Sequence, residues 1–141
     1  EIDSKFKGLK WITPEYKSNP GEEIFLINQA KLYLMNDNRS KMLITHYSFF
    51  SSILNEKLFS PSRWHIFDGT DYPQKGNKYF VSYKNLLIEL IKNNNIAVIY
   101  TIYPVESSLI YIYLDKNCFT EIKISNMLNS YELKSCYEIN D

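Results

Sequence analysis

The sequence predicts an α/β fold, and two observations support this prediction. Short apolar runs bounded by polar or turn-forming residues occur at residues 42–45 and 96–103, a pattern typical of strands buried on both faces. Stretches with helical spacing of apolar residues alternate with these runs. Since 141 residues fit one domain, we expect residues 1–141 to form a three-layer sandwich, with a mainly parallel sheet of about four to five strands and helices on both faces.

The first half of the chain is expected to alternate strands and helices. Residues 8–13 read as a short strand, and the proline that follows them ends it because proline donates no ladder hydrogen bond. A helix is expected over residues 20–35, since a capping asparagine precedes it and a proline occupies its first position. The strand at 42–45 then leads into a short helix over residues 48–54, which Ser48 is expected to cap.

The second half continues the alternation. Residues 78–93 place aromatic and aliphatic side chains on one face, which predicts a helix. Residues 96–103 are β-branched and aromatic and are expected to form the central parallel strand. Residues 107–114 have strand propensity, but the alternation favours a helix there. Residues 119–137 are expected to add one or two strands, with 130–134 as the better candidate.

Ligands of open α/β sheets bind beyond the carboxyl ends of the strands. This rule indicates residues 13–16, 45–48 and 103–108 as the candidate ligand edge. His46 leaves the expected strand at this edge and could act as a general base near neutral pH. We favour the alternative, a packed and hydrogen-bonded histidine, because a base needs partners that sequence does not position.

The expected long loop over residues 59–76 holds the densest cluster of polar and aromatic side chains. An arginine can fork onto a carboxylate or phosphate, a tryptophan can stack on a sugar or base, and two aspartates can hold a cation. Turn chemistry alone is the competing interpretation, because Asp-Gly and proline are frequent turn residues. The candidate binding residues are Arg63, Trp64, His65, Asp68 and Asp71 of this loop, together with Tyr47.

Composition and motifs argue against several functions. Sixteen basic residues balance sixteen acidic ones, so we expect no nucleic-acid partner. Neither G-x-G-x-x-G nor G-x-x-x-x-G-K occurs, no EF-hand register fits, and no serine lies in G-x-S-x-G. The sequence therefore predicts no cofactor, no metal site and no catalytic residue.

Cys118 and Cys136 are the two cysteines of the chain. They lack the C-x-x-C spacing of redox sites and are too few for a zinc site. Either they pair with each other or they are buried thiols, and the sequence leaves both readings open. In an oxidising compartment a disulfide between them would contribute about 3 kcal/mol on the chain-entropy model.

The order of these features resembles a known family of domains. The motifs are L-K-W-I-T-P at residues 9–14, M-L-I-T-H-Y at 42–47 and S-P-S-R-W at 60–64, followed by the strand at 96–103 and the two cysteines. They resemble the soluble carboxyl-terminal domain of bacterial multi-pass membrane proteins that look like type C glycosyltransferases, relatives of the dolichyl-phosphate-mannose protein mannosyltransferases. The chain begins with Glu1, at which translation does not start, so we expect a piece of such a longer protein.

The resemblance implies a location and a set of partners. It places the domain on the extracytoplasmic, periplasmic side of a bacterial membrane, tethered by an upstream transmembrane region of the same polypeptide. There it would serve as a non-catalytic accessory domain that contacts the acceptor, a carbohydrate or a lipid-linked sugar. Two alternatives remain: a small soluble hydrolase that uses His46 with Asp68 or Asp71, and a protein-interaction domain.

Overall fold

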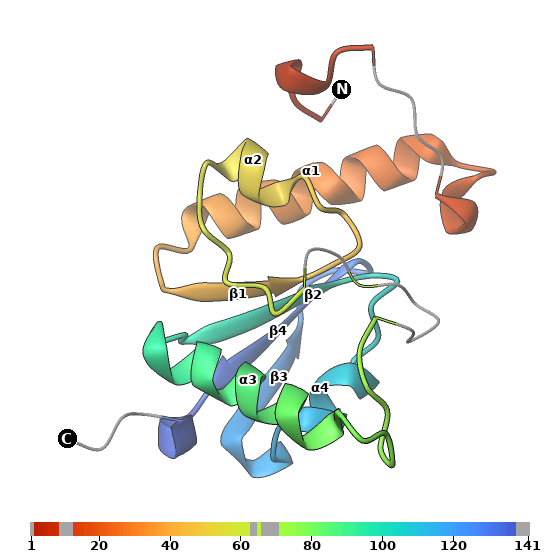
Figure 1. Ribbon diagram of the computed structural model, residues 1–141. Coiled ribbons are helices and arrows are strands. Elements are labelled where there is room, and N and C mark those ends of the chain that lie inside the picture. Colours follow the sequence, from red (N-terminus) through yellow and green to blue (C-terminus); the bar gives the residue numbers. More distant parts are fainter. Residues whose placement is uncertain (1, 9–12, 63–64, 66–70, 138–141) are drawn as a thin grey trace.

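The computed structural model describes residues 2–8, 13–62, 65 and 71–137. It has a mixed α/β arrangement in which one four-stranded sheet carries helices on both faces (Figure 1). The helices are α1 (Pro20–Asn36), α2 (Phe50–Leu54), α3 (Phe80–Asn93) and α4 (Ser108–Tyr113), and the strands are β1 (Lys41–Ile44), β2 (Val98–Ile102), β3 (Phe119–Lys123) and β4 (Leu128–Leu133). None of these helices is long and apolar enough to span a bilayer.

The strand order is β1-β2-β4-β3, and this corrects the expectation of a mainly parallel sheet. Only β1 and β2 run parallel, and the other two pairings are antiparallel. The physical reason is the length of the connections. The 14-residue helix α3 lies between β1 and β2 and provides the long crossover that a parallel pair needs. Only residues 124–127 join β3 to β4, and so short a link permits a hairpin alone.

Two apolar clusters pack on the two faces of the sheet. Helices α1 and α2 cover the face that carries Leu43 and Tyr100, while α3 and α4 cover the face that carries Met42 and Ile99 (Figure 1). Successive residues of β1 alternate between the two clusters, and every residue of β1 and β2 is buried. This burial explains why both strands read as continuous apolar runs in the sequence.

Most expected elements are confirmed. The helix expected at 20–35 is α1, whose capping residue Asn19 accepts a hydrogen bond from the Glu22 amide. The ambiguous segment 107–114 contains the helix α4, and residues 119–137 supply β3 and β4. The expected cap of α2 is wrong: Phe49 precedes that helix, which has no side-chain cap. The strand expected at 8–13 falls mostly on residues 9–12, outside the described residues.

Candidate functional site

The three segments that were expected to form the ligand edge do meet at the carboxyl ends of β1 and β2. The ring of Tyr16 contacts the ring of Tyr103 edge-on, with 6.4 Å between their centroids. Thr13 and Tyr47 both donate hydrogen bonds to Oε1 of Glu23, and the bond from the Tyr47 hydroxyl is 2.7 Å long. The first turn of α1 therefore joins the segments that precede α1 and follow β1.

Glu23 is the buried polar centre of this edge. Glu23 is 2% exposed and Tyr47 is 4% exposed, so the carboxylate and the phenol hydroxyl both lie away from water. Burial, followed by the hydrogen bond to Glu23, raises the pKa of Tyr47 well above its usual value, so the phenol stays protonated and keeps donating. Such a satisfied cluster holds the backbone at the start of α1 and at the end of β1 in one arrangement. Glu23 was missed from the sequence because it reads only as part of the helix expected over residues 20–35.

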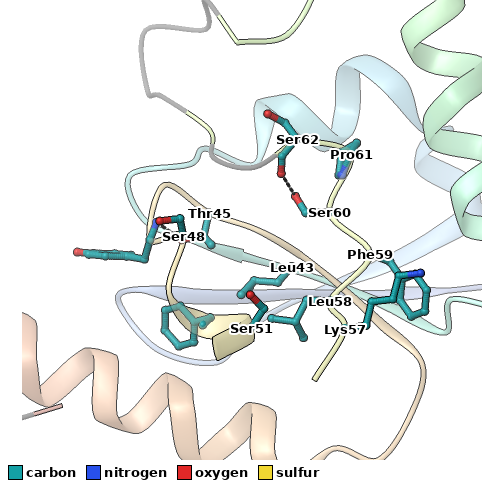
Figure 2. A pocket seen from close by; sticks show the side chains of 12 residues that line it. Leu43, Thr45, Ser48, Ser51, Lys57, Leu58, Phe59, Ser60, Pro61 and Ser62 are labelled. Atoms are coloured by element: carbon teal, nitrogen blue, oxygen red, sulfur yellow. Dashed lines mark hydrogen bonds between the residues drawn. The ribbon is translucent and has the colours of Figure 1, made fainter. Parts of the chain in front are cut away.

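A cavity of about 520 Å³ lies beside this cluster, along the outer edge of β1 (Figure 2). We call it the β1-edge cavity. Two backbone hydrogen bonds attach the following loop to this edge: the Leu43 amide donates to the Leu58 carbonyl at 3.0 Å, and the His65 amide donates to the Thr45 carbonyl at 3.1 Å. Leu43 and Thr45 are two positions apart, whereas their partners Leu58 and His65 are seven positions apart, so residues 59–62, the described part of this segment, arch away from the strand. The cavity lies between this arch, the end of β1 and the start of α2.

The lining of the β1-edge cavity combines apolar side chains with hydroxyl groups. Its apolar part comes from the strand, from α2 and from the arch, and its polar part is a set of hydroxyl groups. Among the described lining residues the single cation is Lys57. The Lys57 ammonium lies 4.7 Å from the centroid of the Phe59 ring. The hydroxyl-bearing lining residues are Thr45, Tyr47, Ser48, Ser51, Ser60 and Ser62. Hydroxyl groups both donate and accept, so the cavity suits a neutral polar ligand.

The sequence predicted two separate candidate regions, and the structure brings parts of both to this cavity. Tyr47 lines it, and so does the S-P-S segment that opens the predicted cluster at residues 60–65. Arg63, Trp64 and Asp68 lie outside the described residues. His65 is fully buried beside the cavity and takes no part in its lining.

His65 packs into the aromatic cluster under α3 and α4. Its ring centroid lies 6.4 Å from that of Tyr72, which in turn contacts Tyr113. Neither ring nitrogen of His65 has a hydrogen-bond partner among the described residues. Burial lowers the pKa of His65 to about 4, so the ring is neutral at physiological pH. His65 is a candidate binding residue by sequence, and the structure places it in the core.

The residues of the hydrolase alternative lie in different surroundings. Burial lowers the pKa of His46, against the opposing charges of Glu15 and Glu23. Burial raises the pKa of Tyr83 and of Tyr113, and the negative charge of Asp71 raises both further. The ring of His46 lies tilted against that of the neighbouring Tyr47, with 3.8 Å between their centroids. No described contact joins His46 to Asp71, so the structure adds no support to that pairing.

A second cavity, of about 660 Å³, lies at the carboxyl end of β2. It includes Glu121 of β3, whose carboxylate accepts hydrogen bonds from Ser107 at 2.8 Å, from Tyr131 at 3.2 Å and from Tyr111. Burial opposes the charged form of Glu121, but these bonds outweigh it and lower its pKa. Residues 103–108 belong to the ligand edge expected from the sequence, but Glu121 was not expected there, because β3 reaches this edge only through its hairpin with β4.

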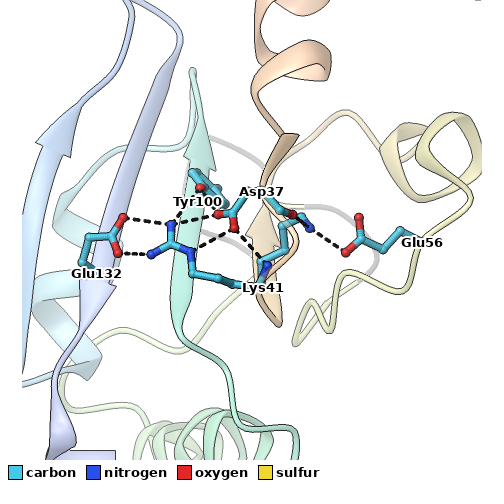
Figure 3. Close-up of polar contacts among 6 residues, drawn as sticks. Asp37, Lys41, Glu56, Tyr100 and Glu132 are labelled. Carbon is cyan, nitrogen blue, oxygen red and sulfur yellow. Dashed lines mark hydrogen bonds and ion pairs between the residues drawn. The ribbon is translucent and has the colours of Figure 1, made fainter. Parts of the chain in front are cut away.

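The opposite end of the sheet is held by charges (Figure 3). Arg39 forks onto Asp37, with nitrogen–oxygen distances of 2.9 and 2.8 Å, and also pairs with Glu132 of β4. The Tyr100 hydroxyl donates to Asp37 at 2.5 Å. Lys41, whose side chain is 1% exposed, donates to the carboxylate of Glu56 at 2.6 Å and to the Asp37 carbonyl at 2.5 Å. We call these residues the amino-end network.

The two cysteines form a disulfide at this same end. Cys118 directly precedes β3 and Cys136 follows β4, with 5.6 Å between their Cα atoms. The Lys134 amide also donates to the Cys118 carbonyl, so the hairpin is closed at its base by both a covalent and a hydrogen bond. Of the two readings that the sequence left open, the structure has the paired one.

Comparisons with models of known protein families, with curated proteins and with solved structures found no match to this chain.

Proposed function

We propose that this chain is a non-catalytic accessory domain, on the extracytoplasmic side of a bacterial membrane, of a glycosyltransferase-like membrane protein. It contacts the carbohydrate or acceptor substrate through the β1-edge cavity. The observation that supports this proposal most is convergence. The candidate residue Tyr47 lines one cavity together with residues 60–62, which directly precede the candidate residues Arg63 and Trp64 in the sequence.

The chemistry of the cavity suits a carbohydrate. Sugars present hydroxyl groups that exchange hydrogen bonds with serine and threonine hydroxyls, and their apolar faces pack on aromatic rings. The rings of Phe50 and Phe59 and the hydroxyls listed above supply both features. The volume of about 520 Å³ lies in the range of small-molecule sites. In the sequence, Arg63 and Trp64 directly follow the lining residue Ser62, and they would add a phosphate-binding fork and a stacking ring.

The disulfide supports the proposed compartment. Stable disulfides are typical of oxidising surroundings such as the bacterial periplasm and are rare in reducing cytoplasm. The proposed partner in the same polypeptide is an upstream transmembrane region, which would hold the β1-edge cavity near the membrane-bound reaction.

Ligand-observed NMR tests the binding site directly. Saturation transfer from the protein to a panel of monosaccharides and to a water-soluble short-chain polyprenyl-phosphate sugar is measured for the wild type and for two tryptophan variants. Ser51 lines the cavity and Ser52 does not, although both are exposed on α2. Ser51→Trp should fill the cavity and abolish transfer, while Ser52→Trp should leave it unchanged. Absence of transfer from every sugar to the wild type, or equal loss in both variants, would contradict the proposal.

A further inference from the structure

The two edges of the sheet differ in how they are covered. The outer edge of β1 is hydrogen-bonded to the loop at Leu58 and His65. The outer edge of β3 carries no described backbone hydrogen bond, and its last four residues are exposed. An uncovered strand edge is a template for pairing with another extended chain. The side chains of β3 determine which extended chain can pair with this edge.

The ladder between β3 and β4 shows which backbone groups are available. The Ile124 amide donates to the Leu128 carbonyl and the Lys134 amide donates to the Cys118 carbonyl, both at 2.9 Å. In an antiparallel ladder hydrogen-bonded pairs alternate with non-bonded pairs. With the observed register, Thr120 and Ile122 therefore bond inward to β4. Phe119, Glu121 and Lys123 direct their amide and carbonyl groups to the open edge.

We propose that β3 pairs antiparallel with β3 of a second copy of this chain, with Ile122 at the two-fold axis, so that the two sheets join into one. In this register Glu121 lies opposite Lys123 of the second copy, and the same pair recurs on the other side of the axis. Both residues have outward-facing backbone groups, so each such pair exchanges both of its backbone hydrogen bonds. The carboxylate and the ammonium group then lie side by side on one face of the sheet.

Charge selects this register over its neighbours. Shifting the axis to Glu121 would place two carboxylates opposite each other, and shifting it to Lys123 would place two ammonium groups opposite each other. Like charges directly opposite destabilise a strand pair. The hydroxyl donors around Glu121 lower the pKa of that carboxyl, so it remains ionised for the pairing. An edge that carried lysine alone would repel its own copy, whereas Glu121 and Lys123 together make the edge self-complementary.

An apolar contact at the axis completes the interface. Ile122 is 47% exposed, which is high for an isoleucine inside a strand. It points to the face covered by α1, where Leu32 and Tyr33 of that helix are also exposed beside the hairpin residues Ile124 and Leu128. Pairing of two copies buries Ile122 against its own counterpart and brings these apolar side chains of both copies toward one groove.

Site-specific cross-linking tests the register. The natural cysteines form a disulfide within the chain, so a single added cysteine supplies the one free thiol. At the axis a non-bonded pair holds its Cα atoms about 4.5 Å apart, within reach of a disulfide. Ile122→Cys should therefore form a covalent dimer under mild oxidation. Thr120→Cys is the matched control, because Thr120 lies on the same face of β3 but opposite Ile124 of the second copy, too far from its own counterpart to cross-link.

Light scattering tests the association itself. The wild type should show twice the 16.7 kDa mass of one chain at high concentration and dissociate on dilution. Lys123→Glu should shift it to the monomer, since Glu121 then faces a second carboxylate, while Lys75→Glu changes the same charge on a distant loop and should leave the dimer intact. A wild type that stays monomeric at millimolar concentration, or equal cross-linking at positions 120 and 122, would overturn the proposal. Neither result depends on whether the β1-edge cavity binds a sugar.

Discussion

The two ends of the parallel strand pair β1 and β2 are stabilised by different interactions. At the amino ends of β1 and β2, Arg39 and Lys41 pair with three carboxylates, and a disulfide closes the base of the adjacent hairpin. At the carboxyl ends the polar centres are the carboxylates of Glu23 and Glu121 with their hydroxyl donors, and burial lowers the pKa of both His46 and His65. Both cavities described above touch this second end.

This difference suggests that the amino end of the sheet stabilises the fold and that the carboxyl end binds a ligand. Charged groups that are fully paired have little left to offer a ligand, and they fix the order of the strands they connect. Hydroxyl groups around a cavity keep donors and acceptors for an incoming molecule. We therefore expect substitutions at the amino end to act on stability, and substitutions at the carboxyl end to act more weakly on stability and more strongly on binding.

Lys41→Ala should have the largest effect on stability. It removes a side chain that is 1% exposed and leaves the Asp37 carbonyl and Glu56 without their cation. We expect a loss of about 4 kcal/mol in the free energy of unfolding, from the lost packing and the broken ion pair together. Urea titration followed by circular dichroism measures it. Lys41→Met keeps the packing and should cost clearly less, and the exposed Lys75→Ala should cost almost nothing; equal losses for Ala and Met would contradict this account.

Removal of the disulfide should have the second largest effect on stability. Cys118 and Cys136 are 18 residues apart, so Cys118→Ala with Cys136→Ala should lower the free energy of unfolding by about 3 kcal/mol on the chain-entropy model. Thermal unfolding with and without dithiothreitol provides the measurement. The reductant should destabilise the wild type to the level of the double variant and leave that variant unchanged. A wild type that is insensitive to the reductant would show that the bond does not constrain the unfolded chain.

Acid should weaken the carboxyl end first. His65 has a pKa of about 4 when folded but takes up its proton near pH 6.5 when unfolded. Its contribution is therefore complete above pH 6.5 and is lost as the pH falls toward 4, by about 2 to 3 kcal/mol. Asp37 behaves differently: burial opposes its charge, but the bonds from Arg39 and Tyr100 hold its pKa well below the usual range. Its contribution is thus lost only in stronger acid.

Urea titrations between pH 4 and pH 7.5 measure this difference. His65→Phe should flatten the dependence of the free energy of unfolding on pH, leaving the smaller slope of the same sign that His46 contributes. Asp37→Asn should lower stability by a similar amount at every pH in this range, because Asp37 stays ionised throughout it. A His65→Phe profile as steep as that of the wild type would refute the assignment to His65.

The smallest of these effects on stability is expected at Tyr47. Tyr47→Phe keeps the buried ring and removes the hydroxyl that donates to Glu23, so about 1.5 kcal/mol should be lost. The matched control is Tyr79→Phe on an exposed tyrosine, which should change nothing measurable. If the β1-edge cavity binds a carbohydrate, Tyr47→Phe should also weaken saturation transfer to the ligand. A loss of stability equal to that of Lys41→Ala would erase the proposed distinction between the two ends.

Local patterns predicted most of the elements. The apolar runs at 42–45 and 96–103 were recognised as buried strands, because burial on both faces removes the alternation of an exposed strand. The alternation of elements also resolved residues 107–114 as a helix against their strand propensity. The directions of the strands were predicted wrongly: the sheet was expected to be mainly parallel, but the short connection between β3 and β4 makes a hairpin.

Of the candidate binding residues, Tyr47 lines the cavity, together with residues 60–62 that were not candidates, whereas His65 lies in the core. The neighbouring sequence does not indicate that His65 is buried. Its burial depends on the long-range hydrogen bond between the His65 amide and the Thr45 carbonyl. Glu23 and Glu121 were missed for a related reason. Each reads as an ordinary surface acid in its own helix or strand, and becomes a polar centre only through hydroxyl donors from distant segments.

The sequence by itself determined the class of fold, the buried strands, most of the helices and the segments that meet at the carboxyl end of the sheet. These features depend on periodicity, propensity and caps, which act over a few residues. Only the tertiary structure decided the order of the strands, the pairing of Cys118 with Cys136, and the open edge at β3. These features depend on contacts between segments that are distant in the sequence, and the free energy of such contacts cannot be read from any one segment alone.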